Sequence, residues 1–220
     1  MENSKEELIS RLLSVIKLDI APKTRVGVSK GNKLFGAAVL LKSDLSLVIA
    51  ETNNETKNPL LHGEVNTITE LYARKDRPVP DPKECIFLAT HEPCSLCLSA
   101  ITWAGYDNFY FLFSHQDSRD SFGIPHDIRI LKEIFDVPSP SSTSSTAPGT
   151  EEQVGVGDGR PLYNRENKFW KSHNIVEIID TFEPGVREPF QKQVADIVSI
   201  YADLSAVYQA SKGGKGIPLA

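Results

Sequence analysis

The sequence predicts an α/β fold, a three-layer α/β/α sandwich built around a mixed five-stranded sheet. Runs rich in β-branched and aromatic residues alternate with segments whose apolar residues recur every three or four positions, as expected when helices cover both faces of a sheet. The first two strand-like runs follow each other directly, which favours an antiparallel pair. Helical segments separate the later runs and favour parallel neighbours, so the sheet should be mixed.

Two helices and two strands are predicted in the first third of the chain. Ser4 and the glutamate three residues later match a capping box, and apolar residues at helical spacing follow, so a helix should cover about 5–18. The runs 35–41 and 45–51 are strand-like and are separated by a polar turn. Residues 62–74 place their apolar side chains on one face, so a second helix should begin at the sequence His-Gly-Glu.

Three more strands are predicted further along the chain. The run 85–90 is continuously apolar, as in a buried strand, and Pro93 after it suits the first turn of a helix. A strand is expected at 108–113, a short helix at 126–135 and a last strand at 175–179. These elements complete the five strands of the predicted sheet.

The chain ends in a long helix, whose predicted apolar stripe runs from Phe190 to Tyr208. Before it, Pro, Ser, Thr and Gly accumulate in a segment that cannot bury enough apolar surface to offset the entropy lost on ordering. We therefore divide the chain into a core at 1–136, a flexible insertion at 137–160, and a strand and helix at 161–220 that complete the same domain.

Composition restricts the class of protein. Apolar residues make up 40% and charged residues 24% of the 220 residues, as in ordinary globular proteins. No apolar run approaches the roughly 18 residues of a membrane span, and the N-terminus does not look like a secretory signal. A soluble, cytoplasmic protein is expected, and a nuclear location is also compatible with these features. The net charge of −5 disfavours a nucleic-acid partner.

One constellation of residues carries chemistry. Cys94 and Cys97 stand three apart at a predicted helix start, where both sulfurs can face one ion, and His62 begins a neighbouring helix. With three cysteines in all, two of them so close, a thiolate metal site is favoured over a disulfide framework. Three protein ligands leave one position of a tetrahedral zinc open, as in catalytic zinc sites. Glu64, two residues from the histidine, could then carry protons.

Each half of this constellation has a simpler interpretation when taken alone. A Cys-x-x-Cys pair is also compatible with redox activity or with half of a structural zinc site. A histidine at a helix start is often a surface or capping residue. The two halves together favour one catalytic zinc per chain.

The arrangement His-x-Glu followed by Pro-Cys-x-x-Cys, with the segment from about 34 to 113 around it, resembles the cytidine deaminase-like superfamily of zinc-dependent nucleobase and nucleoside deaminases. The sequences Thr-His-Glu-Pro-Cys at 90–94 and Trp-Ala-Gly at 103–105 are most similar to the guanine and transfer-RNA adenosine deaminase branch. The glycine of His62-Gly63-Glu64 is instead similar to fungal cytosine deaminase. The resemblance implies zinc ligands His62, Cys94 and Cys97, with Glu64 as the catalytic acid and base.

The resemblance also implies substrate contacts and a quaternary state. Phe35 occupies the place of an aromatic ring that lies against the base, with an ordinary core position as the alternative. Asn53 has the approximate place of an asparagine that holds the ring, and Asn54 or Asn58 are alternatives for that role. Asp117, Asp120 and Asp127 follow the fourth strand in a segment loosely similar to the Gly-Phe-Asp-Asp region of guanine deaminases. One of them could accept a hydrogen bond from an exocyclic amine of the substrate, although solvated loop positions are favoured. Related enzymes are oligomers, so a homodimer is expected.

Three functions follow as alternatives. The first is a hydrolase of cyclic-amidine C–N bonds in nucleobase metabolism, which releases ammonia from a small amino-substituted heterocycle, guanine-like first and cytosine-like second. The second is a transfer-RNA adenosine deaminase or its partner subunit, although noncatalytic partners of that branch replace the glutamate that is present here as Glu64. The third is a noncatalytic protein with a structural zinc, which would need a fourth protein ligand.

Overall fold

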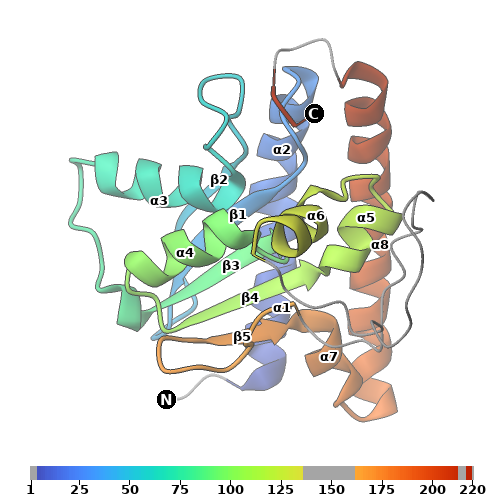
Figure 1. Ribbon diagram of the computed structural model, residues 1–220. Helices are drawn as coiled ribbons and strands as arrows, with labels where there is room; N and C mark the ends of the chain where they lie inside the picture. The colour runs from blue at the N-terminus through green and yellow to red at the C-terminus, as the bar shows by residue number, and fades with distance from the viewer. Residues whose placement is uncertain (1–3, 136–161, 213–216, 220) are drawn as a thin grey trace, which may run out of the picture.

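The computed structural model describes residues 4–135, 162–212 and 217–219 (Figure 1). The insertion predicted at 137–160 lies outside these residues, so the structure does not test it. The remaining predicted helices and strands fall within the described part of the chain.

The centre of the molecule is a mixed five-stranded sheet with the strand order β2-β1-β3-β4-β5. Strand β1 runs antiparallel to both β2 and β3, whereas β3 pairs in parallel with β4, and β4 with β5. The mixed sheet that the sequence predicts is therefore confirmed. The strands are β1 (Gly36–Leu41), β2 (Leu47–Thr52), β3 (Cys85–His91), β4 (Asn108–Phe113) and β5 (Lys171–Asn174).

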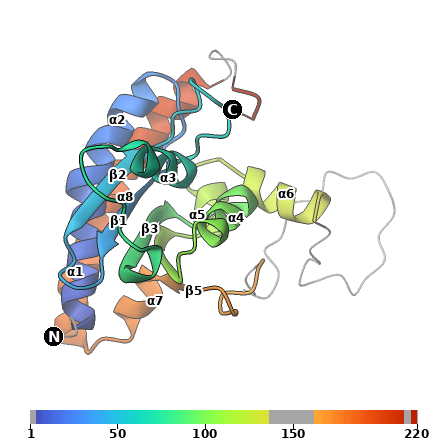
Figure 2. The same ribbon diagram turned by 90° about the vertical axis from the view of Figure 1, so that its left-hand side faces the viewer.

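Helices cover both faces of this sheet, which makes the fold a three-layer sandwich (Figure 2). Side chains alternate across the strands: Leu88 of β3 joins one core, and its neighbour Phe87 joins the other. The first core packs against α1 (Lys5–Val15), α2 (Ala21–Ser29), α7 (Ile175–Asp180) and α8 (Pro184–Ser211). The second packs against α3 (Gly63–Ala73) and α4 (Ser95–Trp103).

The N-terminal helical region is longer than the predicted 5–18. Helix α1 continues through a π-helical segment, η1 (Ile16–Ile20), directly into α2. Pro22 lies in the first turn of α2, where the missing N–H of proline is tolerated. Because a proline there cannot complete a regular α-helical hydrogen bond, the turn before it widens rather than the helix ending.

The strand predicted at 175–179 is wrong. This segment is helix α7, and strand β5 lies just before it. The side chain of Asn174 accepts hydrogen bonds from the backbone N–H groups of Val176 and Glu177, which begins the helix. Ile175 and Ile179, four residues apart, are both buried on one helical face. A short apolar run has no period that separates a strand from a buried helix, which explains the error.

Two short helices follow β4. Helix α5 (His115–Asp120) is not among the predicted elements; Ser114 and Asp117 begin it with a reciprocal capping box. Helix α6 (His126–Glu133) ends slightly before the predicted boundary, and a short 3₁₀ turn, η2 (Pro82–Glu84), precedes β3. Among the described helices, none combines the length and apolar character needed to cross a lipid bilayer.

Candidate metal centre

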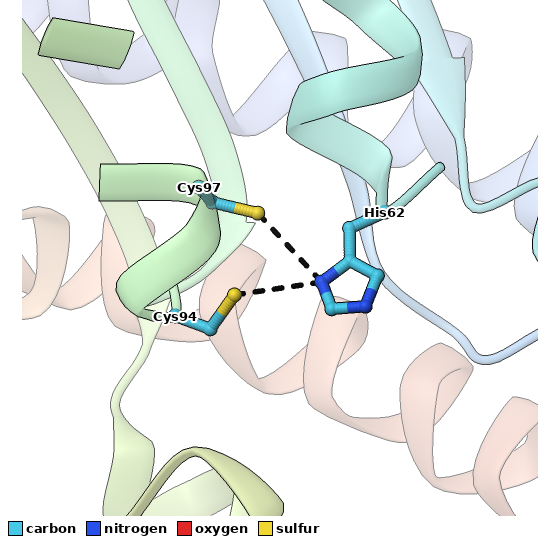
Figure 3. Close-up of side chains that lie close together, drawn as sticks. All are labelled: His62, Cys94 and Cys97. Atoms are coloured by element: carbon cyan, nitrogen blue, oxygen red, sulfur yellow. Dashed lines mark hydrogen bonds between the residues drawn. The ribbon is translucent and has the colours of Figure 1, made fainter. Parts of the chain in front are cut away.

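His62, Cys94 and Cys97 lie together at the starts of two helices, with their side chains turned toward one another (Figure 3). One donor atom from each residue lies within 4.8 Å of the others. The Nδ1 atom of His62 is 3.4 Å from the sulfur of Cys94 and 3.8 Å from the sulfur of Cys97. Within the described residues, this is the group of His, Cys, Asp and Glu side chains whose spacing suits a metal ion.

The donor set and its spacing fit zinc. Zinc bonds of about 2.0 Å to nitrogen and 2.3 Å to sulfur, at a tetrahedral angle, place the two donor atoms about 3.5 Å apart. The two observed nitrogen–sulfur distances, 3.4 and 3.8 Å, lie on either side of that value. One imidazole and two thiolates are also donors that zinc prefers.

The fold delivers these ligands by placing two helix N-termini side by side. His62 is the N-cap of α3 and Cys94 the N-cap of α4, both with extended backbone. Cys97 lies one turn into α4, so its sulfur faces the same side as that of Cys94. The unpaired N–H groups and positive dipole ends of both helices favour the thiolate form of the cysteines.

Steric contact with the backbone of Gly36 explains why the residue between His62 and Glu64 is a glycine. A Cβ atom on Gly63 would lie 2.6 Å from Cα and 2.8 Å from the backbone nitrogen of Gly36. The start of α3 therefore packs backbone against backbone on the start of β1. This contact fixes the position of His62 and Glu64 relative to the sheet.

Glu64 is buried beside the three candidate ligands, with 5% of its surface exposed. The thiol of Cys97 donates a hydrogen bond to Glu64 Oε2 at 3.3 Å. Burial, followed by the negative charge of Cys94, raises the pKa of Glu64 to about 7. A carboxyl group in this position can hold or release a proton close to neutral pH.

The ionisation of the candidate ligands is unequal. A hydrogen bond from Cys97 lowers the pKa of Cys94 well below its ordinary value, and burial raises the pKa of Cys97. For His62, burial lowers the pKa, but the hydrogen bond and charge of Cys94 outweigh it and bring the pKa to about 9. The site thus concentrates negative charge on Cys94.

A small pocket opens beside the three candidate ligands. Its volume is about 10 Å³, which is room for one water-sized molecule, so a heterocycle requires side chains in the wall to move. Phe35, at 9% exposure, forms part of this wall, as does Glu64. The wall also contains three residues that are not among the predicted site residues: His91, Glu92 and Asp127.

Asp127 differs from the two other aspartates after β4. It contributes to the pocket wall, where burial and the charge of Cys94 raise its pKa to about 6. Asp117 instead caps α5 through Ser114, and Asp120 pairs with Arg119 at the surface. Asp127 therefore has the site-facing position considered for one of these aspartates; it is the second residue of α6 and only partly exposed.

Asn53 lies behind the start of α3, and the wall formed by the described residues does not include it. It is 1% exposed, and its side-chain oxygen accepts a hydrogen bond from the backbone N–H of Gly63. Its Nδ2 donates to Glu55, which forms a buried ion pair with Lys33 at 2.7 Å. An amide NH₂ carries two hydrogens, so one donor of Asn53 is engaged by Glu55.

Glu92 connects the pocket wall with the C-terminal segment. Its carboxylate accepts hydrogen bonds from the backbone N–H of His115 and the hydroxyl of Tyr163, both at 2.9 Å. Arg165 adds an ion pair at 3.5 Å. The aromatic sequence at 162–170 therefore contributes Tyr163 to the support of the site, a role that no spacing in the sequence reveals.

Comparison with known proteins gives a family match and several similar structures. Residues 15–113 match the family model of the cytidine and deoxycytidylate deaminase zinc-binding region. A guanine deaminase structure from Bacillus subtilis is 24% identical, with 62% of this chain and 84% of that chain covered and a TM-score of 0.45. One from Nitrosomonas europaea is 12% identical, with 89% and 85% covered and a TM-score of 0.44.

A structure from work on A-to-I editing by tRNA:A34 deaminases is 21% identical, with 43% of this chain and 67% of that chain covered and a TM-score of 0.34. The comparison with curated proteins found no match. The superfamily resemblance that the sequence indicates is confirmed by the family match. The match spans residues 15–113, the part of the chain that contains His62, Glu64, Cys94 and Cys97.

Proposed function

We propose that this protein is a zinc-dependent hydrolytic deaminase of a small amino-substituted nitrogen heterocycle, with guanine-like bases ahead of cytosine-like ones. The observation that carries the proposal is the position of Glu64, a buried carboxyl group 3.3 Å from Cys97 and in the same pocket wall as the three candidate ligands. The match of residues 15–113 to a deaminase zinc-binding region supports it.

His62, Cys94 and Cys97 would hold the zinc ion, which when bound supplies Lewis acidity that activates a water molecule. Glu64 takes a proton from the water while the oxygen of the water bonds to the amino-bearing carbon of the substrate. Glu64 then gives this proton to the adjacent ring nitrogen. It next moves the proton of the new hydroxyl group to the amino nitrogen, the C–N bond breaks, and ammonia and a ring carbonyl are the products.

Two further residues are proposed to hold the substrate. The ring of Phe35 forms part of the pocket wall and offers an apolar face for a planar base. Asn53 donates one amide hydrogen to Glu55 and has a second one that a carbonyl oxygen of the substrate could accept. The net charge of −5 argues against transfer RNA as the substrate.

The direct test is ammonia release by zinc-loaded protein from a panel of aminopurines, aminopyrimidines and aminopterins. At least one compound should be deaminated, and Glu64→Gln should reduce its kcat by about 10²- to 10⁴-fold, because the carboxylate carries the protons. The zinc content of the variant should equal that of wild type. A panel without turnover, or equal rates for both proteins, contradicts the proposal.

A further inference from the structure

His91, the last residue of β3, has a ring nitrogen without a partner. The residue is 3% exposed and forms part of the pocket wall together with Glu64 and the candidate zinc ligands. Its Nδ1 lies 2.9 Å from the hydroxyl oxygen of Thr90, whereas its Nε2 is buried and has no hydrogen-bond partner within the described part of the chain. Folded proteins pair nearly all buried polar atoms, so an unpaired one in a pocket wall points to a ligand.

The surroundings of His91 keep its imidazole neutral. The rings of Phe35, Phe113 and Phe122 have centroids 4.5, 4.8 and 5.1 Å from that of His91. Tyr201 of α8 completes this aromatic environment at 5.5 Å. Burial among these rings lowers the pKa of His91 well below 6.5. A neutral imidazole has one nitrogen that donates and one that accepts.

The hydrogen bonds of Thr90 indicate which nitrogen accepts. The hydroxyl oxygen of Thr90 accepts from the backbone N–H of Gly36 at 3.0 Å, and the hydroxyl group donates to the Gly36 carbonyl at 3.1 Å. A hydroxyl group has a single hydrogen, so the bond to His91 forms when Nδ1 is the protonated nitrogen and donates. The lone pair of Nε2 then remains free, in a side chain that forms part of the pocket wall.

We infer that His91 is a substrate-binding residue whose Nε2 accepts a hydrogen bond from a ring N–H or an amino group of the heterocycle. The inference rests on the proposed deaminase function, and it adds a requirement: the substrate carries a hydrogen-bond donor away from the carbon that is attacked. Glu92 in the same wall does not fill this role, because both of its oxygens accept bonds from the protein.

Nitrogen NMR of the zinc-loaded full-length chain with ¹⁵N-labelled histidine tests the first step. The resonances of His91 are assigned by their absence in His91→Gln. At pH 7 the Nδ1 should carry the hydrogen and the Nε2 should be unprotonated, and the Nε2 resonance should shift when 2-aminopurine or cytosine is added. A hydrogen on Nε2, or an Nε2 resonance that neither base moves, overturns the inference.

Two substitutions separate the two nitrogens. His91→Gln places an amide near the position of Nε2, whereas His91→Asn reaches only the position of Nδ1 and retains a partner for Thr90. For a base that wild type deaminates, His91→Asn should raise KM about 10-fold with a smaller change in kcat, the size of one lost hydrogen bond. His91→Gln should stay within about threefold of wild type. Equal KM values in all three proteins overturn the inference.

Methylated bases complete the test. Replacing in turn each N–H of the accepted base by N–CH₃ should identify one position at which wild type loses about 10-fold in KM and His91→Asn loses nothing further. An active deaminase in which Nε2 of His91 carries the hydrogen contradicts the inference but leaves the proposed function intact. A protein that deaminates no base, but whose Nε2 responds to 2-aminopurine, contradicts the proposed function and supports the inference.

Discussion

Gly63 at the start of α3 lies directly against Gly36 at the start of β1, with no space between them for a side chain. A Cβ atom on Gly63 would stand 2.6 Å from Cα of Gly36, which is backbone and cannot rotate away. The His-Gly-Glu sequence is therefore a packing requirement of this chain. It sets how close the proposed ligand His62 can come to the sheet.

Gly63→Ala should move the start of α3 outward. The overpacking should lower the free energy of unfolding by about 1–3 kcal/mol and weaken zinc binding, because His62 moves with the helix. Gly185→Ala is the matched control, since a Cβ there meets nothing within 4 Å near the start of α8. Chemical denaturation and zinc titration should separate the two variants. Equal stability in both would show that the contact does not constrain α3.

Breaking the buried ion pair of Lys33 and Glu55 should destabilise the fold far more than breaking the exposed pair of Lys23 and Glu51. Its side chains are 6% and 1% exposed, and Glu55 also accepts a hydrogen bond from Asn53. Lys33→Met leaves Glu55 buried without a countercharge, so the free energy of unfolding should fall by about 3–5 kcal/mol. Lys23→Met is the control, because the side chains of Lys23 and its partner Glu51 are 47% and 26% exposed. Its free energy of unfolding should fall by only about 0–1 kcal/mol. Urea denaturation measures the free energy of unfolding of both variants. A fall of less than about 1 kcal/mol for Lys33→Met would show that Glu55 does not depend on Lys33 as its countercharge.

The hydroxyl of Tyr163 should stabilise the pocket wall through Glu92. Burial and the charge of Glu92 raise the pKa of Tyr163, so this hydroxyl remains a donor at neutral pH. Tyr163→Phe should lower the free energy of unfolding by about 1.5–3 kcal/mol, the range for a hydrogen bond to a charged group. Tyr72→Phe is the control, because that side chain is 54% exposed and should be neutral within about 0.5 kcal/mol. Thermal unfolding that does not distinguish the two variants would rule out this support.

The buried imidazole of His91 should make stability depend on pH. Its folded-state pKa lies well below 6.5 because of burial. Below about pH 6.5 the unfolded chain binds a proton at this position and the folded chain does not, so acid favours unfolding. The free energy of unfolding should fall by up to about 1.4 kcal/mol per pH unit from this group, and the difference between wild type and His91→Gln at pH 7, 6 and 5 isolates it. A pH-independent difference would mean that His91 is not neutral in the folded state.

The elements that sequence reasoning predicted well have a clear period or a clear cap. The capping box at Ser4 gives the start of α1, and the helical spacing of apolar residues over 62–74 gives α3. The error at Ile175–Asp180 arose where apolar residues are consecutive and the deciding signal is one capping side chain, Asn174. Tertiary packing then buries Ile175 and Ile179 on one helical face.

The candidate site was predictable only in part, for a physical reason. Local spacing places His62 and Glu64 at one helix start, and Cys94 and Cys97 at another. The resemblance to zinc deaminases supplied the expectation that these two helix starts meet. His91, Asp127 and Tyr163 reach the site through β3, α6 and a segment beyond residue 161, and no local spacing connects them. The sequence also does not reveal the exposure of Trp103. A large aromatic residue on α4 is expected to pack in the core, but this side chain is 90% exposed.

Metal analysis of the purified chain tests the central claim, one zinc ion held by His62, Cys94 and Cys97. Elemental analysis after dialysis should find about one zinc per chain in wild type and in Cys85→Ala, whose thiol lies within β3 away from the site. Cys97→Ala should retain less than about a tenth of that amount, because two ligands bind zinc far more weakly than three. Wild type without tightly bound zinc, or Cys97→Ala with the full complement, would contradict the account.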